Sequence, residues 1–298
     1  MPIATFPCAT PPSTSVRWPD GTALPAIGQG TWRMGERAAA QRAEIAALQH
    51  GLDRGLTLID TAEMYGDGGA EIVVGKALQG RRDRAFVVSK VYPHHASRRA
   101  MRAACERSLK RLGIDTIDCY LLHWASATPM DEIIEGFMHL QAEGKIRGYG
   151  VSNLDDHAMS AWWQHRNGPC CQTNQVLYHL GSRGIEYRLL PLLQQHQLPL
   201  MAYCPLAQGG RLHQRLMQSP AVVEVAKRHS VTPAQVLLAW TIRAQRGQRS
   251  VIAIPKAATP SHIDDNAAAL ALSLEPGDLA LLDHYWPAPA HRVPLDIE

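Results

Sequence analysis

The sequence lacks any apolar run approaching the ~20 residues that a membrane-spanning helix needs, so we expect no membrane partner. Its first residues show no basic segment followed by an apolar stretch, and we expect no secretory signal. It also lacks a block of basic residues and carries a net charge of only +3, which argues against a nucleic-acid partner.

Cysteine is sparse. The sequence has six cysteines, and they are scattered through 298 residues. This spacing is typical of reduced thiols in a cytoplasmic protein and not of a disulfide framework. For the adjacent pair Cys170 and Cys171 a redox role stays open, although a structural role is favoured.

Two familiar site patterns are absent as well. The 14 histidines include no His-x-His strand pattern and no nearby cluster of carboxylates, so we expect no metal and disfavour a metal-dependent barrel hydrolase. His94 and His95 are interpreted as a solvent-facing loop pair. The stretch from Gly28 to Gly35 fails the G-x-G-x-x-G dinucleotide fingerprint because position 33 is an arginine, which argues against a Rossmann fold.

Short apolar runs alternate with longer stretches that carry apolar residues at helical spacing. We expect strands near residues 26–30, 56–60, 85–90, 117–123, 146–151, 171–176, 199–204 and 250–254. Eight strands alternating with helices, without a linker-like break, predict an α/β fold of the (β/α)8 TIM barrel type. We expect residues 16–298 to form this single domain.

Additions to the barrel are also predicted. Residues 1–15 are rich in Pro, Thr and Ser and are interpreted as a loose N-terminal arm. Residues 16–24 predict a β-hairpin around the Asp20-Gly21 turn. Two extra helices are expected near residues 221–229 and 276–285.

In a (β/α)8 barrel the active site lies at the carboxyl ends of the strands. Polar and aromatic residues mark these ends in the present sequence. They are Trp32, Asp60 with Tyr65, Lys90, His123, Ser152 with Asn153, Gln175, Tyr203 and Lys256. We therefore expect all of them to converge on one mouth.

Four of these side chains form a coherent acid site. A lysine ammonium lowers the pKa of a nearby tyrosine, and a carboxylate holds the lysine charged and oriented. Lys90 and Asp60 would act on Tyr65 in this way and make it a general acid. His123 would donate a hydrogen bond to a carbonyl oxygen. Such a site protonates an alkoxide while hydride reaches carbon, and hydride must come from a nicotinamide cofactor.

At this point the sequence resembles the aldo-keto reductases over about residues 16 to 285. Five motifs carry the resemblance: Asp60-Thr61-Ala62-Glu63-Met64-Tyr65-Gly66, Ser89-Lys90-Val91, Leu121-Leu122-His123-Trp124, Gly150-Val151-Ser152-Asn153 and Ile254-Pro255-Lys256. Within the family the chain is similar to small bacterial aldehyde and 2-oxoaldehyde (methylglyoxal-type) reductases. The resemblance therefore implies NADPH-dependent reduction of aldehydes and ketones to alcohols, with broad specificity for small carbonyl substrates.

The resemblance implies site roles too. Asp60, Tyr65, Lys90 and His123 would be the catalytic tetrad. Residues around the cofactor would be Ser152, Asn153 and Gln175 at the carboxamide, Tyr203 on the nicotinamide ring, Cys204, Pro205, Leu206, Gln208 and Gly209 at the pyrophosphate, Lys256 and His262 at the 2′-phosphate, and Asp265 and Asn266 near adenine.

The sequence departs from the family pattern at two positions that concern the 2′-phosphate. Ala257 replaces a common serine, and His262 replaces a common arginine, whose fixed charged fork a neutral histidine does not match. We expect NADPH to be preferred because Lys256 remains, with some use of NADH. Cys204 also replaces a common serine.

Substrate recognition is less specified. Trp32, Tyr92 and Trp124 are expected to wall the substrate pocket, although rim packing is an equal alternative for Tyr92. The short tail of residues 287–298 predicts an open mouth. An alternative function is an NADP(H)-binding redox sensor or scaffold with negligible turnover, which would not need an intact tetrad. We expect a monomer.

Overall fold

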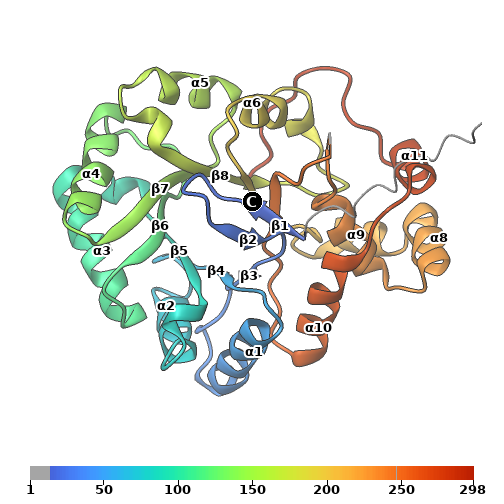
Figure 1. The fold of residues 1–298 in the computed structure, drawn as a ribbon, viewed down its shortest axis with the longest axis horizontal. Coiled ribbons are helices and arrows are strands. Elements are labelled where there is room, and N and C mark those ends of the chain that lie inside the picture. The colour runs from blue at the N-terminus through green and yellow to red at the C-terminus, as the bar shows by residue number, and fades with distance from the viewer. Residues whose placement is uncertain (1–13, 246) are drawn as a thin grey trace, which may run out of the picture.

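A computed structural model describes residues 14–245 and 247–298, in which eight parallel strands form one curled sheet (Figure 1). In order these are β3 (Gln29–Gly30), β4 (Leu58–Asp60), β5 (Phe86–Val91), β6 (Ile117–Leu122), β7 (Ile146–Ser152), β8 (Cys171–Leu177), β9 (Leu200–Tyr203) and β10 (Val251–Ala253). Strands adjacent in the chain are adjacent in the sheet. Parallel bridges from Ile27 to Ala253 and from Gly30 to Lys256 join the first strand region to the last. The predicted barrel is confirmed.

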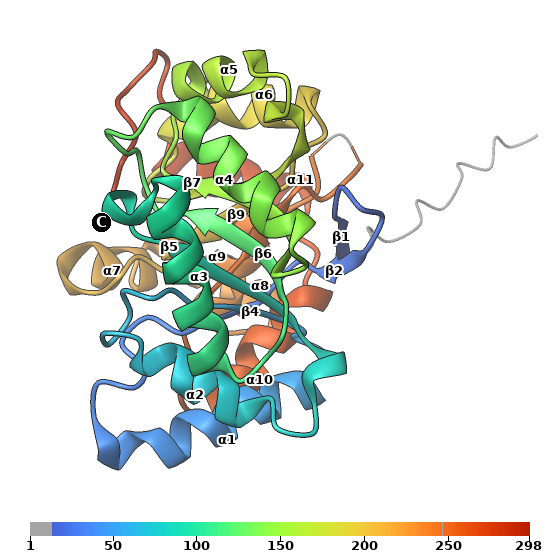
Figure 2. The ribbon, with the colours of Figure 1, turned by 90° about the vertical axis from the view of Figure 1, so that its left-hand side faces the viewer.

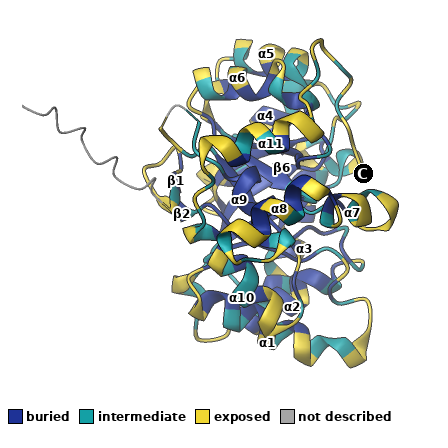
Figure 3. Cartoon of the chain, turned by 90° about the vertical axis from the view of Figure 1, so that its right-hand side faces the viewer, coloured by how far each residue is buried: buried dark blue, intermediate teal, exposed yellow. Residues whose placement is uncertain are grey.

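Helices surround the sheet on its outer side (Figure 1). They are α1 (Gln41–Asp53), α2 (Gly69–Ala77), α3 (Arg98–Leu112), α4 (Met130–Ala142), α5 (Asp156–Gln164), α6 (Leu189–Gln195), α7 (Gly210–Met217), α8 (Pro220–His229), α9 (Pro233–Thr241), α10 (Pro260–Ala268) and α11 (Pro276–Tyr285). Figure 3 shows exposed residues on their outward faces and buried residues towards the strands. No helix in the described part of the chain has the length and apolarity needed to cross a bilayer.

Three helices stand outside the regular strand–helix alternation. The two that the sequence predicts are present as α8 and α11. The third, α7, was not predicted, because it starts directly after Gly209 and the conformational freedom of a Gly-Gly pair favours a loop. Both α7 and α8 are inserted between β9 and its barrel helix α9.

The hairpin covers the end of the barrel where the strands begin. Its strands are β1 (Ser15–Arg17) and β2 (Ala23–Pro25), which pair antiparallel as predicted. Trp18 between them is fully buried, meets Phe86 edge-on at 5.2 Å, and donates from Nε1 to Gln172 Oε1 at 3.0 Å. Figure 2 shows this hairpin and the C-terminus at opposite ends of the barrel. The hairpin therefore leaves the carboxyl ends of the strands free for a site.

The predicted N-terminal arm of residues 1–15 falls almost wholly outside the described residues, which begin at residue 14. Ser15, the last residue of that range, is the first residue of β1 and pairs with Pro25.

Because Trp18 fills the bottom of the barrel, we expect Trp18→Ala to lower the free energy of unfolding by about 3–5 kcal/mol. Urea unfolding followed by far-ultraviolet circular dichroism measures this loss. The control is Trp163→Ala, since Trp163 is only partly buried and stacks on His196 at the surface. An equal or larger loss for Trp163→Ala would contradict the assignment of Trp18 as the residue that closes the barrel.

Candidate active site

A buried ion pair lies at the floor of the barrel mouth. Asp60 ends β4, and Lys90 lies near the end of the neighbouring strand β5. Lys90 Nζ donates to Asp60 Oδ2 at 2.8 Å, to the Thr61 carbonyl at 2.9 Å and to the Tyr65 hydroxyl at 3.1 Å. These three bonds use every proton of the ammonium group, and neither charged side chain is more than 3% exposed.

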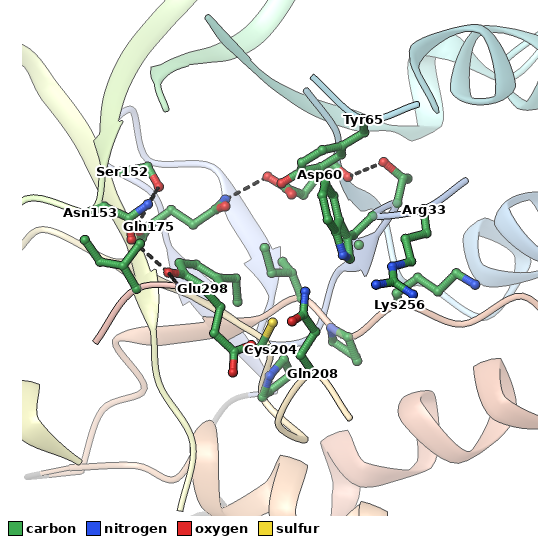
Figure 4. Close-up of a pocket in the computed structure, with 18 of the residues that line it drawn as sticks. Arg33, Asp60, Tyr65, Ser152, Asn153, Gln175, Cys204, Gln208, Lys256 and Glu298 are labelled. Atoms are coloured by element: carbon green, nitrogen blue, oxygen red, sulfur yellow. Dashed lines mark hydrogen bonds between the residues drawn. The ribbon is translucent and has the colours of Figure 1, made fainter. Parts of the chain in front are cut away.

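Burial acts on both members of this pair. It raises the pKa of Asp60 and lowers the pKa of Lys90, while the attraction between the two charges opposes both shifts. Gln175 on β8 further supports the carboxylate, because its Nε2 donates to Asp60 Oδ1 at 2.7 Å. Both oxygens of Asp60 therefore have a donor, and Figure 4 shows the bond from Gln175.

Tyr65 lies directly above the pair, with Lys90 Nζ 4.7 Å from the centroid of its ring. The expectation that Lys90 lowers the pKa of Tyr65 is wrong for this structure. Burial, aided by the charge of Asp60, raises the pKa of Tyr65 well above its ordinary value. The phenol is therefore firmly protonated and serves as a hydrogen-bond donor to the cavity. An alkoxide is a stronger base than a phenolate, so such a phenol can still transfer its proton to one.

His123 follows β6 and lies beside the tyrosine, with 5.8 Å between the two ring centroids. Burial, together with the charge of Lys90, lowers the pKa of His123 to about 2. The imidazole is therefore neutral near pH 7 and carries one N–H. Its Nδ1 is buried without a hydrogen-bond partner, which leaves Nε2 as the nitrogen able to meet a ligand.

A second group of polar residues lies across the mouth, at the ends of β7, β8 and β9. Asn153 is its centre, with a left-handed backbone at φ 58°. Its Nδ2 donates to the His123 carbonyl at 3.2 Å, and its Oδ1 accepts from the Tyr203 hydroxyl at 2.9 Å. Ser152 Oγ donates to the Gln175 carbonyl at 2.8 Å. These bonds hold the side chains of Ser152, Asn153 and Tyr203 in fixed positions.

The cavity between the two groups has a volume of about 730 Å³. Most residues predicted from the sequence line it. These are Trp32, Asp60, Tyr65, His123, Trp124, Ser152, Asn153, Gln175, Tyr203, Cys204, Pro205, Leu206, Gln208, Gly209 and Lys256. Lys90 is fully buried beneath them and reaches the cavity only through Tyr65. The predicted convergence of the strand ends on one mouth therefore holds in the structure.

The remaining predicted residues lie elsewhere. Tyr92 is not part of the lining; its ring packs behind Trp124, at right angles and 6.0 Å from it. The packing alternative for Tyr92 is thus the one that the structure shows. His262, Asp265 and Asn266 are on α10, outside the cavity lining.

The segment after β9 turns sharply around the cavity. Cys204 and Ala207 have left-handed backbones at φ 49° and 56°, and Gly209 has φ 146° and ψ −164°. Only glycine adopts the last conformation readily, and a Cβ placed there would meet no atom within 4 Å. The space beside Gly209 is therefore open.

Sequence reasoning missed several residues of the lining, among them Arg33, His213, Ile297 and Glu298. Arg33 is exposed, has a left-handed backbone at φ 63°, and points towards the same region as Lys256 (Figure 4). The tail, which was expected only to leave the mouth open, contributes the exposed residues Ile297 and Glu298 to the cavity lining. No periodic pattern marks the tail, so only its long-range contacts could have indicated this.

Within the described residues, no group of three or more His, Cys, Asp or Glu side chains is placed to hold a metal ion. The aromatic rings of Trp32 and Trp124 flank the tetrad. The ring centroid of Trp32 is 5.0 Å from that of Tyr65, and the ring centroid of Trp124 is 4.5 Å from that of His123.

Comparison with known proteins gives a family for this architecture. Residues 26–287 match the aldo/keto reductase family. The chain is 53% identical over 282 residues to methylglyoxal reductase YeaE of Escherichia coli (strain K12), which covers 95% of this chain and 98% of that protein. It is 31% identical over 288 residues to methylglyoxal reductase DkgA of the same strain, covering 91% of this chain and 94% of that one.

Solved structures agree with these relatives. The aldo/keto reductase of Klebsiella pneumoniae, crystallised with NADP and acetate, superposes with a TM-score of 0.93 at 55% identity. That match covers 96% of this chain and 100% of the Klebsiella chain. A second structure of a Klebsiella pneumoniae aldo-keto reductase, in complex with NADPH, gives a TM-score of 0.92.

The neutral His123 makes stability depend on pH. An unfolded histidine titrates near pH 6.5, whereas His123 in the folded chain has a pKa of about 2. Between these values the unfolded chain binds a proton that the folded chain does not. Stability is therefore complete above about pH 6.5 and falls as the pH is lowered, by up to about 1.4 kcal/mol per pH unit from this group. We expect His123→Asn to have a shallower slope between pH 7 and 5.

Urea unfolding at both pH values measures this slope. The exposed His284→Asn is the control and should keep the wild-type slope. An unchanged slope in His123→Asn would show that His123 takes up protons equally in the folded and the unfolded chain, and would contradict the lowered pKa.

Proposed function

The chain belongs to the aldo/keto reductase family, and we propose that it reduces small aldehydes and ketones, 2-oxoaldehydes such as methylglyoxal among them, with NADPH as the cofactor. The observation that carries this proposal is the Lys90 ammonium, which contacts Asp60 and Tyr65 at the floor of a cavity lined by Tyr65 and His123. The names of the relatives support the choice of 2-oxoaldehydes.

The bound cofactor supplies the hydride that reaches the carbonyl carbon. Tyr65 then donates its phenolic proton to the oxygen of the developing alkoxide. Lys90, held by Asp60, stabilises the phenolate that remains, since its Nζ already lies 3.1 Å from the Tyr65 oxygen. His123 donates from Nε2 to the carbonyl oxygen, which is thereby oriented between His123 and the Tyr65 hydroxyl.

The cavity suits an extended dinucleotide. Ser152, Asn153 and Gln175 would hold the carboxamide, and Tyr203 would stack on the nicotinamide ring. The left-handed turns from Cys204 to Gly209 would present backbone groups to the pyrophosphate. The proposed residues near adenine, Asp265 and Asn266, are on α10 beyond the cavity lining.

Recognition of the 2′-phosphate would combine three groups. Lys256 and Arg33 both line the cavity, and neither makes an ion pair with an acidic side chain in the described part of the chain. His262 lies in the first turn of α10. Two permanent cations attract a phosphate strongly, so we propose that Arg33 compensates for the arginine that His262 replaces.

The substrate would enter between Trp32 and Trp124. Small or flat carbonyl compounds fit such a slot best, which supports methylglyoxal and simple aromatic aldehydes. The monomeric state and the cytoplasmic location stay predictions from the sequence.

Replacing Tyr65 by phenylalanine removes the proposed acid and leaves the cavity intact. We expect Tyr65→Phe to lower kcat for methylglyoxal reduction by about 10²–10⁴-fold, measured by NADPH absorbance, with NADPH binding retained. The control is Tyr120→Phe, because Tyr120 is buried behind the barrel wall beside Phe137 and should keep wild-type activity. If the wild type binds NADPH and reduces no carbonyl tested, the redox sensor becomes the better proposal.

Removing Arg33 tests the proposed phosphate site. We expect Arg33→Ala to weaken NADPH binding by about tenfold, as loss of one charged hydrogen bond does, and to leave NADH binding nearly unchanged. Fluorescence titration with both cofactors gives the ratio. Arg37→Ala is the control, because Arg37 is exposed on the same loop outside the cavity lining. An equal loss for both cofactors would place Arg33 at the pyrophosphate instead.

A further inference from the structure

Glu298 lines the proposed dinucleotide site from the exposed rim of the mouth. The C-terminal strap, residues 287–298, leaves α11 and returns to the mouth of the barrel, where Ile297 and Glu298 become part of the cavity lining. Figure 4 shows Glu298 beside Cys204 and Gln208. A carboxylate thus borders the cavity that the cofactor is proposed to use.

The strap is anchored outside the cavity. Arg292 pairs with Asp155 at 3.0 Å and with Asp156 at 2.9 Å, both at the start of α5. Ser182 Oγ donates to the carboxylate of Asp296. These contacts fix the course of the strap up to Asp296, so the final two residues can leave the cavity without the strap detaching.

Glu298 contacts Tyr203 and Gln208, two residues that are proposed to bind the cofactor. Its backbone N–H donates to the Tyr203 hydroxyl at 3.4 Å. With the Gln208 amide oriented to satisfy both of its neighbours, its nitrogen donates to Glu298 Oε2 at 3.2 Å and its oxygen accepts from Trp32 Nε1 at 3.1 Å. These bonds connect the C-terminus to both sides of the mouth.

The thiol of Cys204 also faces the Glu298 side chain. Burial, with the Glu298 carboxylate as a further cause, raises the pKa of Cys204 to about 12, so the thiol keeps its proton and can donate it to that carboxylate. Cys204 stands where the family commonly has serine, a position to which the sequence alone assigned no effect.

The charge at this position opposes the cofactor. The side-chain carboxylate of Glu298 forms no ion pair with Lys, Arg or His among residues 14–245 and 247–298. NADPH carries several negative charges on its phosphates. An unpaired carboxylate and phosphates at one cavity repel each other.

We propose that Glu298 is a latch: it holds the end of the strap in the dinucleotide site of the cofactor-free enzyme, and NADPH must displace it to bind. This inference rests on the proposed cofactor site. It follows that the measured affinity for NADPH is the intrinsic affinity reduced by the fraction of molecules with an open latch.

The test compares wild type with a truncated chain lacking Ile297 and Glu298, with Glu298→Gln, and with Glu135→Gln. Glu135 is an exposed carboxylate on α4 that does not line the cavity, and it serves as the charge-matched control. Stopped-flow quenching of tryptophan fluorescence by NADPH gives the association rate constant and the dissociation constant, at low and at high salt.

If the latch is closed nine-tenths of the time, truncation should raise both the association rate constant and the affinity by about tenfold. Glu298→Gln should give a smaller gain, because the backbone contact with Tyr203 remains. Glu135→Gln should match wild type. High salt should reduce the difference between wild type and truncated chain, since salt screens the repulsion. A gain in affinity cannot arise from misfolding of the variant.

Unchanged binding in the truncated chain would overturn the latch. Weaker binding with a faster dissociation rate would also overturn it, because the strap would then close over bound cofactor. If no protein in the set, wild type included, binds NADPH, the proposed cofactor site itself is wrong and the latch falls with it.

Discussion

The site depends on the ion pair between Asp60 and Lys90. Asp60 Oδ2 and Lys90 Nζ are 2.8 Å apart, and both side chains are almost completely buried. Burying two charges costs several kcal/mol per ion unless the geometry is good and the remaining hydrogen-bonding positions are filled. Here they are filled, by Gln175 on the carboxylate and by the Thr61 carbonyl and the Tyr65 hydroxyl on the ammonium. Loss of one partner would leave an uncompensated charge, which typically costs about 3–5 kcal/mol.

The same pair connects distant parts of the barrel. Asp60 and Lys90 come from the neighbouring strands β4 and β5, and Gln175 reaches them from β8. Gln175 also accepts from Ser152 through its carbonyl, and Ser152 is adjacent to Asn153, which contacts His123 and Tyr203. The acid side and the proposed nicotinamide side of the mouth are therefore one hydrogen-bonded unit. A substrate meets donors that are already in place, which is the condition for electrostatic stabilisation of developing charge.

The parts of this site that the sequence predicts are those fixed by regular structure. Asp60, Lys90 and Gln175 could be identified because each lies at or near the end of a strand, and parallel strands of a closed barrel bring those positions together. The pKa of Tyr65 could not be predicted in the same way. Its direction depends on how deeply the phenol is buried, and this burial outweighs the nearby ammonium.

The parts that sequence reasoning missed depend on irregular backbone. Arg33 reaches the cavity through a left-handed turn, and α7 follows a Gly-Gly pair that by itself favours a loop. The strap returns to the mouth through the Arg292 contacts with Asp155 and Asp156, which are separated from it by more than a hundred residues. A contact of this kind leaves no periodic pattern in the sequence from which it could be predicted.

Charge is distributed unevenly around the mouth. Arg33 and Lys256 bring positive charge from the region where β3 meets β10, whereas Glu298 brings negative charge beside Tyr203, at the end of β9. An anionic dinucleotide entering this cavity is attracted at one side and repelled at the other. The phosphates should therefore engage the cationic side before the nicotinamide can reach Tyr203, since that last step requires Glu298 to withdraw. In this order of events Glu298, which is not a member of the tetrad, governs when the acid site becomes usable.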